Sequence, residues 1–343
     1  MIGAGEHAYA YAKACGIIGK SFVGRRIPAL HQVNRLSELD RLVFGADARE
    51  LPERELLLDL EGRLSRRSVS AFSSVLNSYK KVPELLSLLI RVYEYADLKT
   101  ALTLIIESET SVKPVFTPLG RFGTVNFDAW PDAKAMLAGT DFEFLFDKYI
   151  NRSGTVTEED RDSVSLETEL DRLYYTKLWK SLGKLKKNDR RAAEKISAEE
   201  IALRNCSWVL RLRTYYNMKA DEVKKHLIII EGNSRLCADA LAALEFSLDY
   251  PADWEKWKRL PFLNPFSYSG VWRADPRYFQ NAAAEHLYRL ARRNFRIRPA
   301  SVDAVFCFIK LKQFEEDLLI SNAEGLGMGM TSKDVLGLLE VSP

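Results

Sequence analysis

The sequence predicts an all-α protein. Between Pro131 and Pro251 the chain contains no proline and only four glycines. Proline and glycine are the usual residues of loops, so long helices are expected there. Apolar residues also recur at intervals of three or four, which places them on one face of a helix. A sustained alternation of apolar and polar residues, which would indicate half-buried strands, is not found.

Three long helices are predicted from the apolar spacing. Steps of three and four run over residues 88–105, 208–215 and 302–318. Each helix would bury an apolar stripe and leave its charged residues outside. The length of 343 residues favours two or three domains over one.

Helix ends are predicted from local signals. Ser197 is followed three residues later by Glu200, the spacing of a capping box. Asp275-Pro276 and Pro299 have the residue types of N-caps and first turns. Gly325 is interpreted as a helix stop.

Two segments are predicted to be loops. Residues 113–126 contain prolines and glycines and are the main candidate for an extended excursion, and residues 261–276 combine turn formers with aromatics. The aromatics of this region could stack on nucleic-acid bases. Packing of a connection between helices against the core is the favoured interpretation. The residues concerned are Trp254, Trp257, Phe262, Phe266, Tyr268 and Trp272.

The helix centres suggest an internal repeat. Asp97, Asn205 and Asp317 each precede a small or branched apolar residue, at spacings of 108 and 112 residues. These spacings are close to one third of the chain, which favours triplication of one helical module, although so degenerate a match can also arise by chance. The predicted division is into three helical repeats, with the N-terminal helix shared: residues 1–112, 113–225 and 226–343.

No catalytic, cofactor-binding or metal-binding residues are predicted. The chain lacks the P-loop pattern GxxxxGK[ST] and the GxSxG elbow, and its four histidines have neither HxxxH nor HExxH spacing. Three acidic pairs are interpreted as solvated helix faces or capping charges, because catalytic carboxylates need a cleft that perturbs their pKa. These pairs are Glu158-Glu159, Glu199-Glu200 and Glu315-Glu316.

Charge and cysteine content bound the class of protein. Fifty basic and 47 acidic residues give a net charge of +3, which argues against a protein that wraps nucleic acid. The four cysteines are far apart and form no CxxC pair, as expected of a reduced intracellular protein with small buried thiols. No stretch approaches the roughly 20 apolar residues of a transmembrane helix, and the N-terminus lacks the pattern of a secretory signal.

The predicted helices resemble those of a known family. Residues Glu200 to Arg213, EIALRNCSWVLRLR, resemble a recurrent helix of the form E-I-D-x-x-N-hydrophobic-x-x-x-hydrophobic-R-x-[KR]. That helix occurs in the C subunit of prokaryotic A/V-type ATPases and in the d subunit of eukaryotic V-type ATPases. Ala202 departs from the pattern. Three other segments are similar to the family's first copy, its terminal helix and its start: residues 93–105, 306–325 and 9–22.

The resemblance implies a fold and a function. It implies three similar helical domains around a pseudo-threefold axis, forming a funnel. The wide mouth would receive the rotor shaft of the soluble motor, and the narrow side would rest on the membrane proteolipid ring. The implied role is a non-catalytic central-stalk connector for ion transport or ATP synthesis. It would be peripheral, on the cytoplasmic side, with one copy per complex and no cofactor.

Two groups of arginines are candidate interface residues. Arginine can form fork-like contacts with carboxylates, and the basic stretch 289–298 can face an acidic partner or lipid headgroups. A solvated, salt-bridged helix end is the alternative for that stretch. The candidates are Arg204, Arg211, Arg213, Arg292, Arg293 and Arg296.

Other functions remain as alternatives to the connector. An unrelated α-helical repeat scaffold for protein–protein interaction comes first among them. A helical hydrolase with a dispersed site and a nucleic-acid binder follow.

Overall fold

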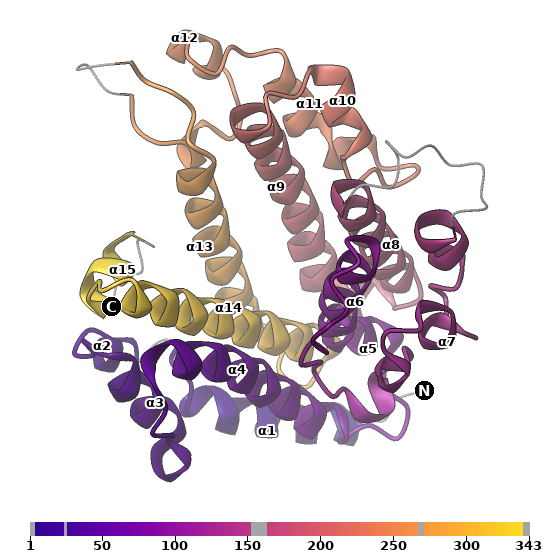
Figure 1. Cartoon of the computed structure of the whole chain (residues 1–343), viewed down its shortest axis with the longest axis vertical. Coiled ribbons are helices and arrows are strands. Elements are labelled where there is room, and N and C mark those ends of the chain that lie inside the picture. Colours follow the sequence, from indigo (N-terminus) through magenta and orange to yellow (C-terminus); the bar gives the residue numbers. More distant parts are fainter. Residues whose placement is uncertain (1–3, 24–25, 152–162, 267–270, 339–343) are drawn as a thin grey trace.

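A computed structural model of the chain describes residues 4–23, 26–151, 163–266 and 271–338. Every regular element among these residues is a helix (Figure 1), which confirms the predicted fold class. The α-helices are α1 (Ala4–Gly19), α2 (Ile27–Leu30), α3 (Leu36–Phe44), α4 (Glu53–Leu76), α5 (Glu84–Ile90), α6 (Val92–Ile106), α7 (Ala133–Leu137), α8 (Ser163–Gly183), α9 (Arg191–Tyr215), α10 (Ala220–Lys225), α11 (Ala238–Leu244), α12 (Pro251–Trp254), α13 (Pro276–Phe295), α14 (Val302–Gly327) and α15 (Ser332–Leu338).

Helix α14 is the element around which the others are arranged. It packs against α1, α3, α4 and α5 from the first third of the chain, against α9 from the middle, and against α13 and α15 near the end. Figure 1 shows α14 in yellow, lying across the molecule between α4 and the α9–α13 pair. Helices that are far apart in the sequence are therefore joined through one long helix.

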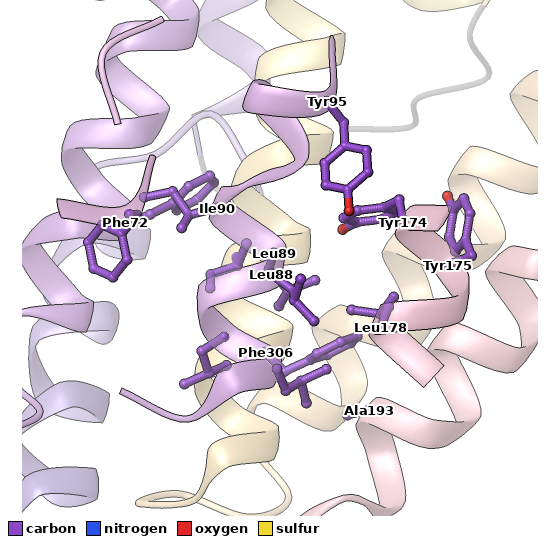
Figure 2. Packing of buried hydrophobic residues seen from close by; sticks show 14 of the residues in the cluster. Phe72, Leu88, Leu89, Ile90, Tyr95, Tyr174, Tyr175, Leu178, Ala193 and Phe306 are labelled. Carbon is purple, nitrogen blue, oxygen red and sulfur yellow. The ribbon is translucent and has the colours of Figure 1, made fainter. Parts of the chain in front are cut away.

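The largest hydrophobic core of the described residues lies where α1, α4, α5, α6, α8, α9, α13 and α14 meet. Figure 2 shows Phe72 of α4, residues 88–90 of α5, Tyr95 of α6, Leu178 of α8 and Phe306 of α14 in this core. Most of these side chains have less than 5% of their surface exposed. Residues from all three predicted repeats contribute to this core, and the division into repeats stays a prediction.

A second core holds the aromatic segment. Trp254 is fully buried and Trp272 almost so, and both pack with α9, α11 and α13. The indole N–H of Trp254 donates to the carbonyl of Ser247 at 2.7 Å. Packing between helices, the favoured interpretation of these aromatics, is thus what the structure shows, although Tyr268 lies outside the described residues.

The phased helices are confirmed with shifted boundaries. The first is broken at Arg91 into α5 and α6. The second begins at Arg191, so Ser197 is a buried residue inside α9 and its predicted role as a cap is wrong. The N-terminal donors of α9 are satisfied from a distance, because the carboxylate of Asp303 accepts the N–H groups of Ala192 and Ala193 at 3.1 and 3.0 Å. Local sequence cannot reveal such a cap.

Two other helix-end predictions have opposite outcomes. Asp275 is the N-cap of α13, and its carboxylate accepts the N–H of Arg277 at 2.8 Å, as predicted. Gly325 does not end its helix, since α14 continues to Gly327. A Cβ atom at Gly325 would lie 2.2 Å from Cγ2 of Val335 in α15. Glycine is therefore required there by the close approach of α15. The prediction that Pro299 begins the last long helix is wrong, because Pro299 precedes α14 and Ser301 is its N-cap.

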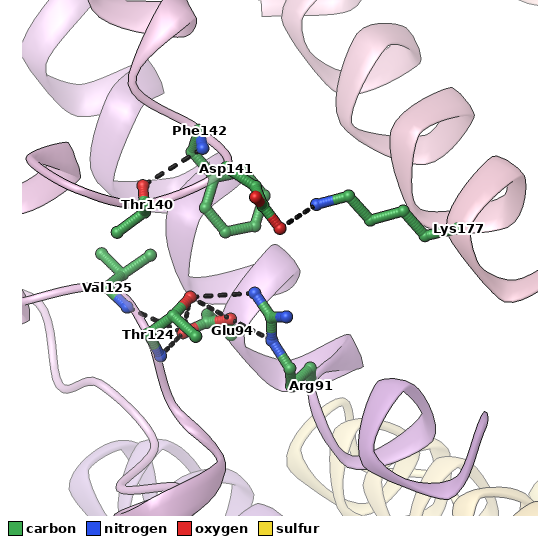
Figure 3. A network of polar contacts seen from close by, with 8 residues as sticks. All are labelled: Arg91, Glu94, Thr124, Val125, Thr140, Asp141, Phe142 and Lys177. Atoms are coloured by element: carbon green, nitrogen blue, oxygen red, sulfur yellow. Dashed lines mark hydrogen bonds and ion pairs between the residues drawn. The ribbon is translucent and has the colours of Figure 1, made fainter. Parts of the chain in front are cut away.

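The predicted loop after α6 is confirmed and is anchored by a buried carboxylate. Glu94 is 1% exposed and accepts N–H groups from Thr124 and Val125, the latter at 2.8 Å. Arg91 pairs with Glu94 at 2.7 Å and also donates to the hydroxyl of Thr124 (Figure 3). This network holds residues 113–126 against α6 without a strand.

The acidic pair on α14 is buried, so its interpretation as a solvated face is wrong. Glu315 and Glu316 are 1% and 7% exposed. Glu315 pairs with Lys312 and accepts the N–H of Phe22 at 2.6 Å, while Glu316 accepts the hydroxyl of Ser65 at 2.7 Å. Buried carboxylates need such partners. The pair fastens the N-terminal region to α14. Residues 158–159 lie outside the described part of the chain.

Two further sequence expectations can be compared with the structure. The four cysteines are free, and Cys206, Cys237 and Cys307 are buried, but Cys15 is exposed. Among the described residues, none of the helices combines the length and apolar character needed to cross a bilayer.

Candidate functional site

A cleft lined by both apolar and charged residues lies between α9, α13 and α14. It consists of two adjoining cavities of about 360 and about 150 Å³. Both are lined by Glu200 of α9, Ala284 and Leu287 of α13, and Asp317 of α14. We call this space the α9–α13–α14 cleft.

The 3.6-residue period of the α-helix places charged residues on the cleft face of α9 and of α14. Glu200, Arg204 and Arg211 are spaced by four and seven residues, so they follow one face of α9. Lys310 and Asp317 are seven residues apart on α14 and line the cleft from the other side. The small residues of α13 leave room between the two rows.

One ionic link joins α9 to α14 at the base of this cleft. The ammonium group of Lys310 contacts both carboxylate oxygens of Glu200. Its Nζ lies 2.7 Å from Oε2 and donates to Oε1 at 2.9 Å. The hydroxyl of Tyr175 on α8 donates to the same carboxylate at 3.1 Å. Glu200 therefore connects three helices.

A second ionic link joins α6, α8 and α9. Asp171 of α8 accepts two hydrogen bonds from Arg204, at 2.7 and 3.1 Å, and one from Lys99 of α6 at 2.6 Å. Burial alone would raise the pKa of Asp171, but the two cations hold it below its usual value. Arg204 also lies over the ring of Tyr175, 5.6 Å from its centroid. The guanidinium is thus fixed within the protein.

Two charged groups of the cleft are left open to a partner. Asp317 is exposed and forms no ion pair with a described residue. Partial desolvation by the cleft walls, together with the neighbouring Glu316, raises the pKa of its carboxyl above its usual value. Arg211 is exposed, lies over the ring of Trp208, and likewise has no acidic partner in the described ranges. The cleft therefore offers one cation and one titratable carboxyl for recognition.

The three candidate arginines of α9 differ in their surroundings. Arg204 and Arg211 line the cleft. Arg213 instead donates to the carbonyls of Ala243 and Phe246, each at 2.7 Å, at the end of α11. Its guanidinium therefore satisfies carbonyls at a helix C-terminus.

The three candidate arginines of α13 lie away from the cleft. Arg292, Arg293 and Arg296 are exposed at the C-terminal end of the helix and in the residue that follows. Arg292 lies over the ring of Tyr288, and Arg293 lines a separate cavity. The structure does not bring these three together with Arg204 and Arg211.

The acidic and lysine members of the cleft are absent from the residues predicted from sequence. Asp317 is recognisable there as a repeat centre and Glu200 as part of an acidic pair, but neither is assigned to a site. The spacing of seven residues between Lys310 and Asp317 is the signal that places them on one face. Within the described ranges, no three His, Cys, Asp or Glu side chains are grouped so that they could hold a metal ion.

Comparison with known proteins identifies the family. Residues 43–336 match the family described as ATP synthase (C/AC39) subunit. The chain is 28% identical over 327 residues to an uncharacterized protein of Treponema pallidum, covering 94% of this chain and 92% of that protein.

Two archaeal relatives carry a functional name. Over 81 residues the chain is 32% identical to the A-type ATP synthase C subunit of Methanosarcina mazei and 33% identical to that of Methanosarcina barkeri. Each of these alignments covers 24% of this chain and 22% of the archaeal protein.

The family match spans most of the chain and agrees with its all-helical fold. Members of this family are non-catalytic components of the ATPase stalk, so the chain is not itself an enzyme. The chain belongs to the ATP synthase (C/AC39) subunit family and is a subunit of a V/A-type ATPase.

Proposed function

We propose that this protein is the central-stalk connector of a rotary ATPase. It passes torque between the rotor shaft of the soluble motor and the proteolipid ring in the membrane, on the cytoplasmic side and in one copy per complex. The observation that carries the proposal is the family match over residues 43–336. Depending on the parent machine, the torque serves ion transport or ATP synthesis.

The ionic links between helices support this role. A part that transmits torque must resist bending, and close-packed helices provide stiffness. Glu200 ties α9 to α14 and α8, and Asp171 ties α8 to α6 and α9. Such cross-links oppose sliding of one helix past another.

The α9–α13–α14 cleft is the proposed socket for part of the shaft. Arg211 and Asp317 would meet side chains of opposite charge on the shaft, since neither has an ionic partner among the described residues. The three-repeat funnel belongs to the same proposal. Asp97 and Asn205 support the repeat, because each accepts a backbone N–H group from a loop further along the chain, after α6 and after α10 respectively.

Native mass spectrometry of reconstituted components tests the proposal. The full chain is mixed with purified shaft proteins and with the detergent-solubilised proteolipid ring from the same source. The expected species contains shaft, one copy of this chain and the ring. A chain that is folded by circular dichroism but joins neither component would overturn the connector role and favour the helical scaffold.

A further inference from the structure

A second cavity, of about 410 Å³, lies where the first turns of α9 meet the end of α13. It shares no lining residue with the α9–α13–α14 cleft. Four basic side chains line it, and we call it the basic cavity. They are Arg191, Lys195, Arg293 and Arg298.

The charge of the basic cavity is unbalanced. Asp303 is its one acidic lining residue, so the lining carries a formal charge of +3, equal to that of the whole chain. The carboxylate of Asp303 is fully buried and is directed to the N–H groups of Ala192 and Ala193. It therefore serves both as the cap of α9 and as the acidic group of the cavity lining.

Three of the four basic side chains lack an ionic partner among the described residues, whereas Arg298 donates to the carbonyl of Asn188 and acts on the charge of Asp303. Arg191, Lys195 and Arg293 form no ion pair with a described residue, whereas Arg289 on the same helix α13 pairs with Glu285. Like charges that converge on a small space repel one another. A bound anion would remove this repulsion, and the positive end of the α9 dipole favours an anion at the same place.

The size of the cavity and the convergence of its charges indicate the kind of anion. About 410 Å³ is within the range of small-molecule sites and too narrow for a protein helix. Several cations around one small volume suit a single group that carries two charges and several acceptor oxygens, which a carboxylate side chain does not. Leu290 and the half-exposed Ile297 provide apolar contacts beside the charges.

We propose that the basic cavity binds a phosphate monoester group. The group is carried either by a free phosphate compound or by the headgroup of an anionic lipid. Arginine guanidinium groups and the lysine ammonium of the lining hold its oxygens, and the apolar residues contact the carbon atoms attached to it. The inference does not depend on the connector role, because it rests on a cavity separate from the proposed socket.

Binding measurements on the full-length protein distinguish the two sources. Inorganic pyrophosphate is titrated by calorimetry, as the probe for free phosphates. Flotation with phosphatidylcholine vesicles that contain phosphatidic acid probes the lipid source, and vesicles with phosphatidylserine control for charge alone. Saturable binding of pyrophosphate assigns a free phosphate, and preference for phosphatidic acid over phosphatidylserine assigns the lipid.

Two neighbouring arginines of α13 provide a matched pair of variants. Arg293→Ala removes a cavity side chain, whereas Arg292→Ala removes the same charge from an exposed position outside the cavity. Arg293→Ala and Lys195→Ala are each expected to weaken binding about tenfold or more, which is the loss of one charge-assisted contact. Arg292→Ala is expected to change it less than about twofold. Lys195→Ala keeps the test valid if Arg293→Ala does not fold.

Two results would overturn the proposal. One is the absence of saturable binding to pyrophosphate together with equal affinity for the two anionic vesicles. The other is an equal loss of affinity in Arg292→Ala and Arg293→Ala, since that would show a general attraction to a basic helix end rather than a cavity site.

Discussion

Asp97 and Asn205 make the same contact on two different helices. Oδ2 of Asp97 lies 2.7 Å from the backbone nitrogen of Thr117, and Oδ1 of Asn205 lies 2.8 Å from that of Ile228. Thr117 lies in the loop after α6, whereas Ile228 lies in the loop after α10, so each side chain holds a loop further along the chain. Asn205 also donates to the carbonyl of Ile228 at 3.0 Å, a bond that a carboxylate cannot make. The first helix therefore bears a charge where the second bears a neutral amide.

This difference predicts a pH effect on stability. Burial, with a smaller contribution from Glu94, raises the pKa of Asp97 from 3.8 to about 6. Between about pH 4 and pH 6 the folded state thus binds more protons than the unfolded state, so stability falls as pH rises through this window. Asp97→Asn keeps the acceptor for Thr117 and removes the charge. We expect it to flatten this slope and to raise the free energy of unfolding at about pH 8 by roughly 1 kcal/mol.

Urea unfolding at several pH values between about 4 and 8 measures the effect of Asp97→Asn. Thr100→Ser changes an exposed residue on the same helix that does not titrate in this range, so it shows whether any substitution in α6 alters the pH dependence. If the slope of stability with pH is unchanged in Asp97→Asn, the assignment of the titration to Asp97 is wrong.

The Asp171 link is expected to contribute strongly to stability. Asp171→Asn would leave Lys99 and Arg204 without their carboxylate in a largely buried place. We expect the free energy of unfolding to fall by about 2 kcal/mol, which is less than the roughly 3–5 kcal/mol of a fully buried pair because Arg204 is partly exposed. Chemical denaturation at neutral pH provides the measurement.

Asp141→Asn is the matched control for Asp171→Asn. Asp141 pairs with Lys177 at 2.7 Å, but its side chain is 65% exposed. Asp141→Asn should therefore lower the free energy of unfolding by about 0.5 kcal/mol or less. Equal losses for the two variants would show that the burial of Asp171 is not what makes its link strong.

Gly325 is expected to be intolerant of any side chain. Gly325→Ala places a Cβ atom 2.2 Å from Cγ2 of Val335, so α15 must shift. We expect a loss of about 1–3 kcal/mol, the usual cost of overpacking. Adding Val335→Ala removes the clash and should recover part of the loss. Thermal unfolding of both variants is compared with Gly16→Ala, where a Cβ would meet nothing within 4 Å. A neutral Gly325→Ala would contradict the close packing of α15.

Charge reversal distinguishes the roles of Arg211 and Arg213, two nearby arginines of α9. Arg211→Glu should weaken shaft binding about tenfold or more without lowering the melting temperature, because Arg211 has no internal ionic partner among the described residues. Arg213→Glu should instead lower stability by about 1–3 kcal/mol, because its guanidinium bonds the carbonyls of Ala243 and Phe246. Binding and melting curves are measured for both. Unchanged shaft binding in a folded Arg211→Glu protein would remove Arg211 from the proposed socket.

Residue spacing was sufficient to predict the long helices, and local signals predicted only some of their ends, such as the Asp275 cap of α13. The apolar stripe of α14 is visible in the sequence because each helix follows the same period of 3.6 residues. The start of α9 is not, because its cap is Asp303, more than 100 residues away. Gly325 was predicted to end a helix because glycine is common at helix C-termini, but it lies inside α14, where the lack of a side chain allows α15 to pack closely. Local signals fail where a distant segment satisfies or constrains the backbone.

The candidate site was predicted only in part for a similar reason. Arg204 and Arg211 were singled out by charge and spacing, and both line the cleft. The same reasoning could not show that Arg213 is occupied by two carbonyls, or that Glu315 is buried beside Lys312. The sequence alone does not show whether a charged side chain is ion-paired, buried or exposed to a partner.

The sequence by itself determined the helical class and the family. Both depend on information that is local or linear: the spacing of apolar residues, the scarcity of proline and glycine, and the order of helix motifs along the chain. The tertiary structure decided which charges are free. Arg211, Asp317 and the lining of the basic cavity are defined by what lies beside them in space. Ion pairing and burial depend on distances between residues far apart in the chain, and the packing of α9, α13 and α14 sets those distances.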